Sequence, residues 1–134
     1  MATTGPFVVP GPPSLIPAQL LIALENQDLL LPHTVTVIVT RQSFGAPPFT
    51  PVTAVNIFTS VVVLPAGQCD ILIVPASPVT ASSGFDANDI LKVEIIGEFA
   101  AGLIEGSVVG RYANGKNEPT MFVRFEEFVS VLPG

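Results

Sequence analysis

The stretch that decides the fold class is HTVTVIVTR, which covers residues 33–41. Val35, Val37 and Val39 alternate with polar residues, and Ile38 is the one apolar residue on the threonine side. Successive side chains of a strand point to opposite faces, so a period of two in β-branched residues is typical of a half-buried strand. The stretch therefore predicts a strand whose valine face is turned toward a core.

The chain around this strand has the same character. Residues 89–96 alternate, with Leu91, Val93 and Ile95 on one face. Further strands are expected over residues 52–64 (long or bulged), 69–74, 99–112 (one strand or two) and 120–132, with turns at LPAGQ, residues 64–68, and at Asn114-Gly115. Residues 17–26 fit a helix and a strand almost equally, with a slight preference for the strand. This organisation predicts an all-β protein, a single jelly-roll-like β-sandwich over residues 18–134.

The last expected strand contains a change of phase. Met121, Val123 and Phe125 share one parity, whereas Phe128 has the other. Because the side-chain period of a strand is two, this change predicts a bulge or bend near residues 126–127.

Charge is scarce and unevenly distributed. The 134 residues carry 5 Lys and Arg and 11 Asp and Glu, a charged fraction of 12% and a net charge of −6. Residues 1–85 hold only four of these charges, namely Glu25, Asp28, Arg41 and Asp70. Charged side chains normally cover a domain's surface, so an uncharged surface of this extent is expected to be hidden against copies of the same chain. A surface of Thr, Ser, Gln and Asn is the alternative.

The same composition excludes several classes of protein. Cys69 is the single cysteine, so no disulfide forms within the chain. A net charge of −6 disfavours nucleic-acid binding. The charge-free stretch over residues 42–69 is broken by prolines and holds too short an apolar run for a membrane span, and the first residues lack the basic region of a classical secretion signal.

Residues 1–17 form a proline-rich segment, which we call the arm. Proline fixes φ and lacks a backbone donor, so the arm is expected to be extended. Its apolar residues would not be left in water, and they are Phe7, Val8, Val9, Leu15 and Ile16. We expect them to form a subunit interface by adding a strand to a neighbouring copy, with docking on the chain's own sheet as the alternative.

Three glycines recur every four residues, at Gly102, Gly106 and Gly110. On a strand they share one face with larger residues, and this face could admit another backbone closely. A strongly curved strand within the sandwich explains the spacing equally well.

Candidate catalytic and metal-binding groups are few. His33 is the single histidine and is expected to be a surface or capping residue, while Cys69 is expected to be a small core residue. Asp86, Asn88 and Asp89 could bind Ca²⁺ weakly, but such loop residues more often bond to their own backbone. Adjacent strand residues point to opposite faces, so Glu126 and Glu127 cannot flank one glycosidic bond. We therefore expect no enzyme activity, no cofactor and no metal.

The chain resembles the endospore-appendage subunits. The matching parts are residues 3–17 of the arm, the strands over 35–40 and 61–74 around LPAGQ, and the closing strands over 91–131. The endospore-appendage subunits are jelly-roll proteins that form extracellular fibres on Gram-positive spore formers. The resemblance implies that residues 7–16 dock on a neighbouring subunit and that the chain is located outside the cell or on the spore surface. Better-known members carry connector cysteines, which this arm lacks. The resemblance therefore does not extend to disulfide cross-linking.

The sequence thus predicts a non-enzymatic, self-assembling fibre subunit whose partners are copies of itself. A closed, for example trimeric, jelly-roll module for binding or capsid decoration is the alternative.

Overall fold

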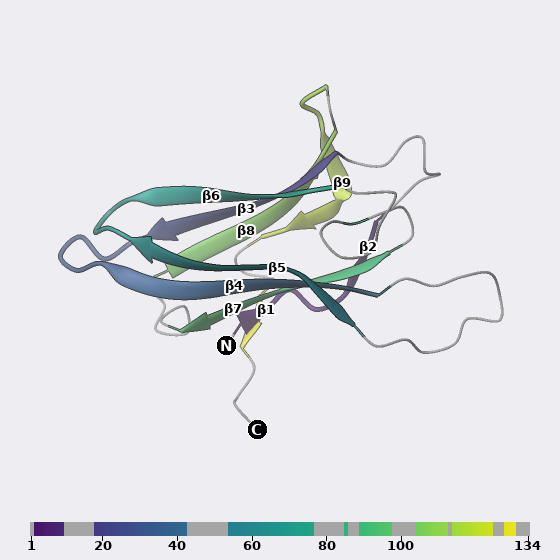
Figure 1. Ribbon diagram of the computed structural model, residues 1–134. Coiled ribbons are helices and arrows are strands. Elements are labelled where there is room, and N and C mark those ends of the chain that lie inside the picture. The colour runs from purple at the N-terminus through teal and green to yellow at the C-terminus, as the bar shows by residue number, and fades with distance from the viewer. Residues whose placement is uncertain are drawn as a thin grey trace.

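The computed structural model describes residues 2–9, 18–42, 54–76, 85, 89–97, 104–112, 114–124 and 128–130. These residues form two antiparallel sheets that pack face to face (Figure 1). Sheet A has the order β10 (Val129–Ser130), β1 (Ala2–Thr3), β7 (Ile90–Gly97), β4 (His33–Gln42), β5 (Val55–Leu64), and β2 (Phe7–Val8) also pairs with β7. Sheet B has the order β6 (Cys69–Pro75), β3 (Gln19–Asn26), β8 (Ile104–Arg111), β9 (Asn117–Val123). The expected all-β sandwich is confirmed.

The core lies between the sheets and follows the alternation of the sequence. Val35, Val37 and Val39 of β4 are buried, while Ile38 stays on the other face with the threonines. The same alternation buries further residues of β3 and β7, namely Leu20, Ile22, Leu24, Leu91, Val93 and Ile95. Removing this apolar surface from water is the main contribution to the stability of the sandwich.

The chain path alternates between the sheets. It passes from one sheet to the other between β2 and β3, β3 and β4, β5 and β6, β6 and β7, β7 and β8, and β9 and β10. The pairs β4–β5 and β8–β9 are hairpins within one sheet. As a result, the loop after β3 and the turn after β5 meet at one end of the sandwich, which we call the tip (left in Figure 1).

Three segments refine the expectations from sequence. Residues 19–26 form a strand and not a helix. β5 is bulged, because its register against β4 shifts between Val39 and Thr40. The expectation of one strand over residues 120–132 is wrong, since β9 belongs to sheet B and β10 to sheet A. Residues 125–127, where the change of phase and the expected bulge or bend fall, lie outside the described residues.

Candidate functional site

The N-terminal segment, residues 2–9, runs along β7 of its own chain. Ala2 and Thr3 pair with β10 on one side and β7 on the other, and Phe7 and Val8 pair with the start of β7. Between the two strands, the Thr4 N–H donates to the Val93 carbonyl at 3.0 Å. The segment is therefore an integral part of sheet A.

The side chains of this segment also complete the core. Ala2 is 1% exposed and Val9 is 0% exposed, and Phe7 packs against the core from its edge. Val8 points outward and is 54% exposed. Of the expected interface residues, Phe7, Val8 and Val9 thus dock on the chain's own sheet, whereas Leu15 and Ile16 lie outside the described residues.

A buried ion pair lies beside the end of this segment. The Arg41 Nη2 atom is 2.9 Å from the Asp89 Oδ2 atom, and both side chains are less than 10% exposed. The Asp89 carbonyl accepts a hydrogen bond of 2.9 Å from the Val9 N–H. Arg41 continues the parity of the buried valines of β4, a signal in the sequence that could have predicted its burial. Asp89 therefore holds the guanidinium of Arg41, while Asp86 and Asn88 lie outside the described residues.

The tip of the sandwich presents three consecutive leucines. Leu29, Leu30 and Leu31 are 80%, 87% and 60% exposed in the loop over residues 27–32, which we call the leucine loop. No other apolar side chains among the described residues form such a consecutive exposed group. Large exposed apolar groups of this kind mark contact sites more often than isolated exposed residues do.

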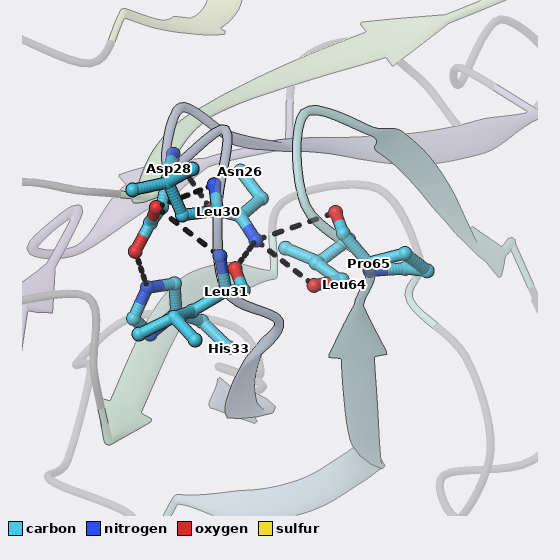
Figure 2. A network of polar contacts seen from close by, with 7 residues as sticks. All are labelled: Asn26, Asp28, Leu30, Leu31, His33, Leu64 and Pro65. Atoms are coloured by element: carbon cyan, nitrogen blue, oxygen red, sulfur yellow. Dashed lines mark hydrogen bonds and ion pairs between the residues drawn. The ribbon is translucent and has the colours of Figure 1, made fainter.

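A polar network holds the leucine loop in place (Figure 2). The buried Asn26 side chain donates from Nδ2 to the carbonyls of Leu31, Leu64 and Pro65 at 3.0, 2.9 and 3.3 Å. Its Oδ1 atom accepts a hydrogen bond of 2.9 Å from the Asp28 N–H. One amide thus ties the loop after β3 to the turn after β5, and buried polar groups require such partners. Asn26 was not among the residues predicted from the sequence, although an Asn at the end of an apolar strand is a signal for such a role.

Asp28 extends the network into the loop. Its Oδ1 atom accepts from the N–H groups of Leu30 and Leu31 at 2.9 and 3.2 Å, and its Oδ2 atom lies 2.8 Å from the His33 Nε2 atom. The Leu30 hydrogen bond and then the His33 hydrogen bond hold the pKa of Asp28 below its usual 3.8. His33 therefore braces the leucine loop from the start of β4 through the Asp28 carboxylate, with its side chain only 11% exposed.

The outer face of sheet B is organised in rows of cross-strand neighbours. From the tip, the first three rows are the acidic row (Cys69, Glu25, Glu105), the small row (Ile71, Ala23, Ser107) and the large row (Ile73, Leu21, Val109, Phe122). The fourth is the basic row (Pro75, Gln19, Arg111, Asn117). An apolar band therefore crosses the sheet between a border that carries Glu25 and Glu105 and a border that carries Arg111. At the β9 end of the band, the Arg124 guanidinium lies 5.8 Å from the centroid of the Phe122 ring.

A shallow hollow of about 280 Å³ lies over the acidic and small rows. Ala23 and Ser107 are small enough to leave this space, and Ile71 and Glu105 also line it. Cys69 lines the same hollow and is exposed, so its expected place in the core is wrong. It falls on the outward parity of β6, which faces solvent on this side.

The glycine-spaced strand is β8. Gly106 and Gly110 are buried on its inner face, and Gly102 lies outside the described residues. A Cβ atom added at Gly110 would lie 2.8 Å from the Cβ atom of Met121 on β9. The close approach at Gly110 is therefore made by a side chain of the same sandwich.

Within the described ranges, no three His, Cys, Asp or Glu residues gather so that they could hold a metal ion. The described part of the chain also has no helix that is both long and apolar enough to span a bilayer. Comparison of the chain with protein-family models, curated proteins and solved structures finds no match. The surfaces described above are therefore the basis for a functional proposal.

Proposed function

We propose that this protein is a structural subunit that polymerises into an extracellular or surface fibre by exchanging its N-terminal segment between copies. The observation that carries the proposal is the pairing of residues 2–9 along β7, with Ala2 and Val9 in the core. A segment that supplies both ladder hydrogen bonds and core side chains makes the same contacts whether it comes from its own chain or from a neighbour. Exchange of such an element is a low-cost route to association.

The sequence that follows the segment suits an exchange. Residues 10–17 include four prolines, and eight residues can reach at most about 29 Å. Prolines in a hinge restrict its conformations and lower the entropy lost when the exchanged form is fixed. Head-to-tail exchange does not use the same patch on both copies, and such heterologous contacts generate open filaments unless the rotation closes a ring.

The low charge of residues 1–85 supports the same proposal. Val61 and Val63 of the edge strand β5, together with Ile71 and Ile73 of the edge strand β6, are exposed. Open sheet edges with apolar side chains favour the addition of strands from another copy. The kinship with endospore-appendage subunits and the surface location are parts of this proposal.

The experiment compares two single-cysteine variants in a Cys69→Ser background. Thr3 and Glu94 are directly opposite each other on β1 and β7, at a separation that suits a disulfide. One variant carries Thr3→Cys and the other Glu94→Cys, and the two are refolded together and oxidised. A disulfide between the two different chains forms efficiently only if residue 3 of one copy lies beside residue 94 of another. In the matched control, the second chain carries Thr59→Cys, on the exposed side of β5, in place of Glu94→Cys.

Exchange predicts a cross-linked heterodimer with the Glu94→Cys partner and none with the Thr59→Cys partner. Electron microscopy of the unmodified chain distinguishes the geometries, because fibres have a distribution of lengths and a closed trimer is a uniform particle. Cross-linking no stronger than in the control would refute strand exchange. Uniform particles with cross-linking would favour the closed module.

A further inference from the structure

We infer that the outer face of sheet B is a two-fold interface, on which a second copy of this chain packs face to face with its strands running in the opposite direction. This contact uses the other sheet from the one that holds the N-terminal segment. It therefore goes beyond the proposed strand exchange and does not depend on it.

The apolar content of the face supports a docking surface. Ile71, Ile73 and Phe122 are 59%, 49% and 41% exposed, and Leu21 and Val109 lie between Ile73 and Phe122 in the large row. These side chains form a band that continues across all four strands. Packed sheets hide such bands from water at a distance of about 10 Å between their backbones.

The charges of the face identify the partner as another copy. Glu25 and Glu105 are directly opposite each other on neighbouring strands, an arrangement that is unfavourable for like charges. Arg111 lies six residues from Glu105 on β8 and is exposed at the opposite border of the band. Among the described residues, none of these three side chains takes part in an ion pair. The face therefore carries an acidic and a basic border, each of which would be satisfied by the other.

A two-fold axis that crosses the strands at the level of Ile22 matches these features. Because the rows are two residues apart, the axis places the acidic row of each copy over the basic row of the other, and the large row over the small row. Glu105 then faces Arg111 of the second copy twice, once on each side of the axis. Leu21 and Val109 of the second copy point into the hollow over Ala23 and Ser107.

The alternative axis, parallel to the strands, is unfavourable. It would place Glu25 and Glu105 of one copy over the same residues of the other, and like charges facing each other across an interface cost several kcal/mol. It would also place the large row over the large row, which leaves the hollow empty. Charge and shape therefore select the antiparallel arrangement.

The size of the face suits a modest dimer. Four strands at about 4.8 Å and eight residues at about 3.4 Å give a face of about 500 Å² on each copy. The total of about 1,000 Å² is at the lower limit for specific protein interfaces, so we expect association in the micromolar range. Measurements over a range of concentrations are needed to observe it.

The test keeps the full chain and closes the other route to assembly. Thr3→Cys and Glu94→Cys are combined in one chain with Cys69→Ser and oxidised at high dilution, which fixes the N-terminal segment on its own β7. Sedimentation velocity of this locked chain then reports association through the remaining surfaces alone. Ile73→Lys probes the large row, and Ile96→Lys is the matched control on the outer face of sheet A.

Charge reversal provides the specific readout. In the locked chain, Glu105→Arg or Arg111→Glu alone should weaken the dimer at least about tenfold, because two symmetry-related pairs become repulsive. An equimolar mixture of the two variants should recover the dimer, since each repulsive pair becomes an attractive one, and the double variant should recover it as well. Ile73→Lys should abolish the dimer and Ile96→Lys should preserve it.

A locked chain that stays monomeric up to about 1 mM would overturn the inference. It would also be overturned by a mixture that associates no better than the separate variants, because a loss without recovery shows only damage to the fold. Strand exchange is tested by the disulfide between two chains, whereas the face-to-face dimer is tested by sedimentation of the locked chain. A negative result in one experiment therefore leaves the other proposal unaffected.

Discussion

The Asn26 network allows a quantitative prediction for the stability of the tip. Asn26→Leu keeps the size and branching of the side chain and removes its hydrogen bonds: the two N–H groups of Nδ2 are shared among three carbonyls, and Oδ1 accepts one further bond. Each N–H that loses its bond contributes about 0.5–1.5 kcal/mol net, so the loss of three should be about 1.5–4.5 kcal/mol. For 134 residues the unfolding entropy is about 0.28 kcal/mol/K, which converts this loss into a decrease in Tm of about 5–16 °C.

The measurement is chemical and thermal denaturation followed by circular dichroism at one protein concentration. Asn56→Leu is the matched control, because Asn56 also uses both ends of its amide, with Thr59 and with the Phe58 N–H, but is exposed. The control should change the free energy of unfolding by less than about 0.5 kcal/mol. If Asn26→Leu costs less than about 1 kcal/mol, the amide does not hold the leucine loop and the turn together.

Three further predictions concern other contacts. Because the pKa of Asp28 is lowered in the folded chain, the contribution of its carboxylate to the free energy of unfolding is complete above pH 3.8. This contribution is lost as the pH falls through the lower pKa of the folded chain. Asp28→Asn should remove this acid dependence, which is measured as the rate of hydrogen exchange in the leucine loop at a series of pH values. The hydrogen bond from Tyr112 to Glu118 raises the pKa of the single tyrosine above 10.0, so ultraviolet titration should give a lower midpoint in Glu118→Gln, and an unchanged midpoint would refute the contact. Gly110→Ala should destabilise the fold by about 1–3 kcal/mol through its clash with Met121, and denaturation at wild-type stability would contradict this packing.

The fold was largely predictable where one face of a strand is buried. The valines of β4 and the alternation of β7 determined both the strand and its inward face, because a shift of one residue would expose the whole set. The turn at Asn114-Gly115 was also predicted correctly, and Gly115 adopts a φ of 86° there. Local periodicity and turn chemistry are therefore sufficient to predict these elements.

Features that depend on the choice of sheet were harder to predict. A change of phase near residue 126 indicates a bend, but periodicity alone does not show that β9 and β10 belong to different sheets. The exposure of Cys69 follows from the position of β6 at the edge of sheet B, and the pairing of Arg41 with Asp89 depends on a contact between separate strands. These properties depend on non-local pairing, about which a single sequence carries little information.

The four rows on the outer face of sheet B could not be predicted from the sequence for the same reason. Leu21, Ile73 and Val109 come from separate parts of the chain, and only the registers of β3 with β6 and β8 place them in one row. Residues 2–9 of the arm differ in that their apolar side chains indicated docking correctly, while the choice between the chain's own sheet and a neighbour's could not be made from composition. These described residues of the arm occupy the chain's own sheet.

The braced leucine loop has a consequence for adhesion. Its backbone is already fixed by Asn26 and Asp28, so a surface that binds its leucines does not need to order the loop first, and preorganisation of this kind improves affinity. In a polymer of the proposed kind, the loop would recur once per subunit at a regular spacing. Repeated weak contacts on one scaffold gain avidity by factors of about 10²–10⁴. A contact too weak for a single subunit could therefore hold a whole fibre on an apolar surface.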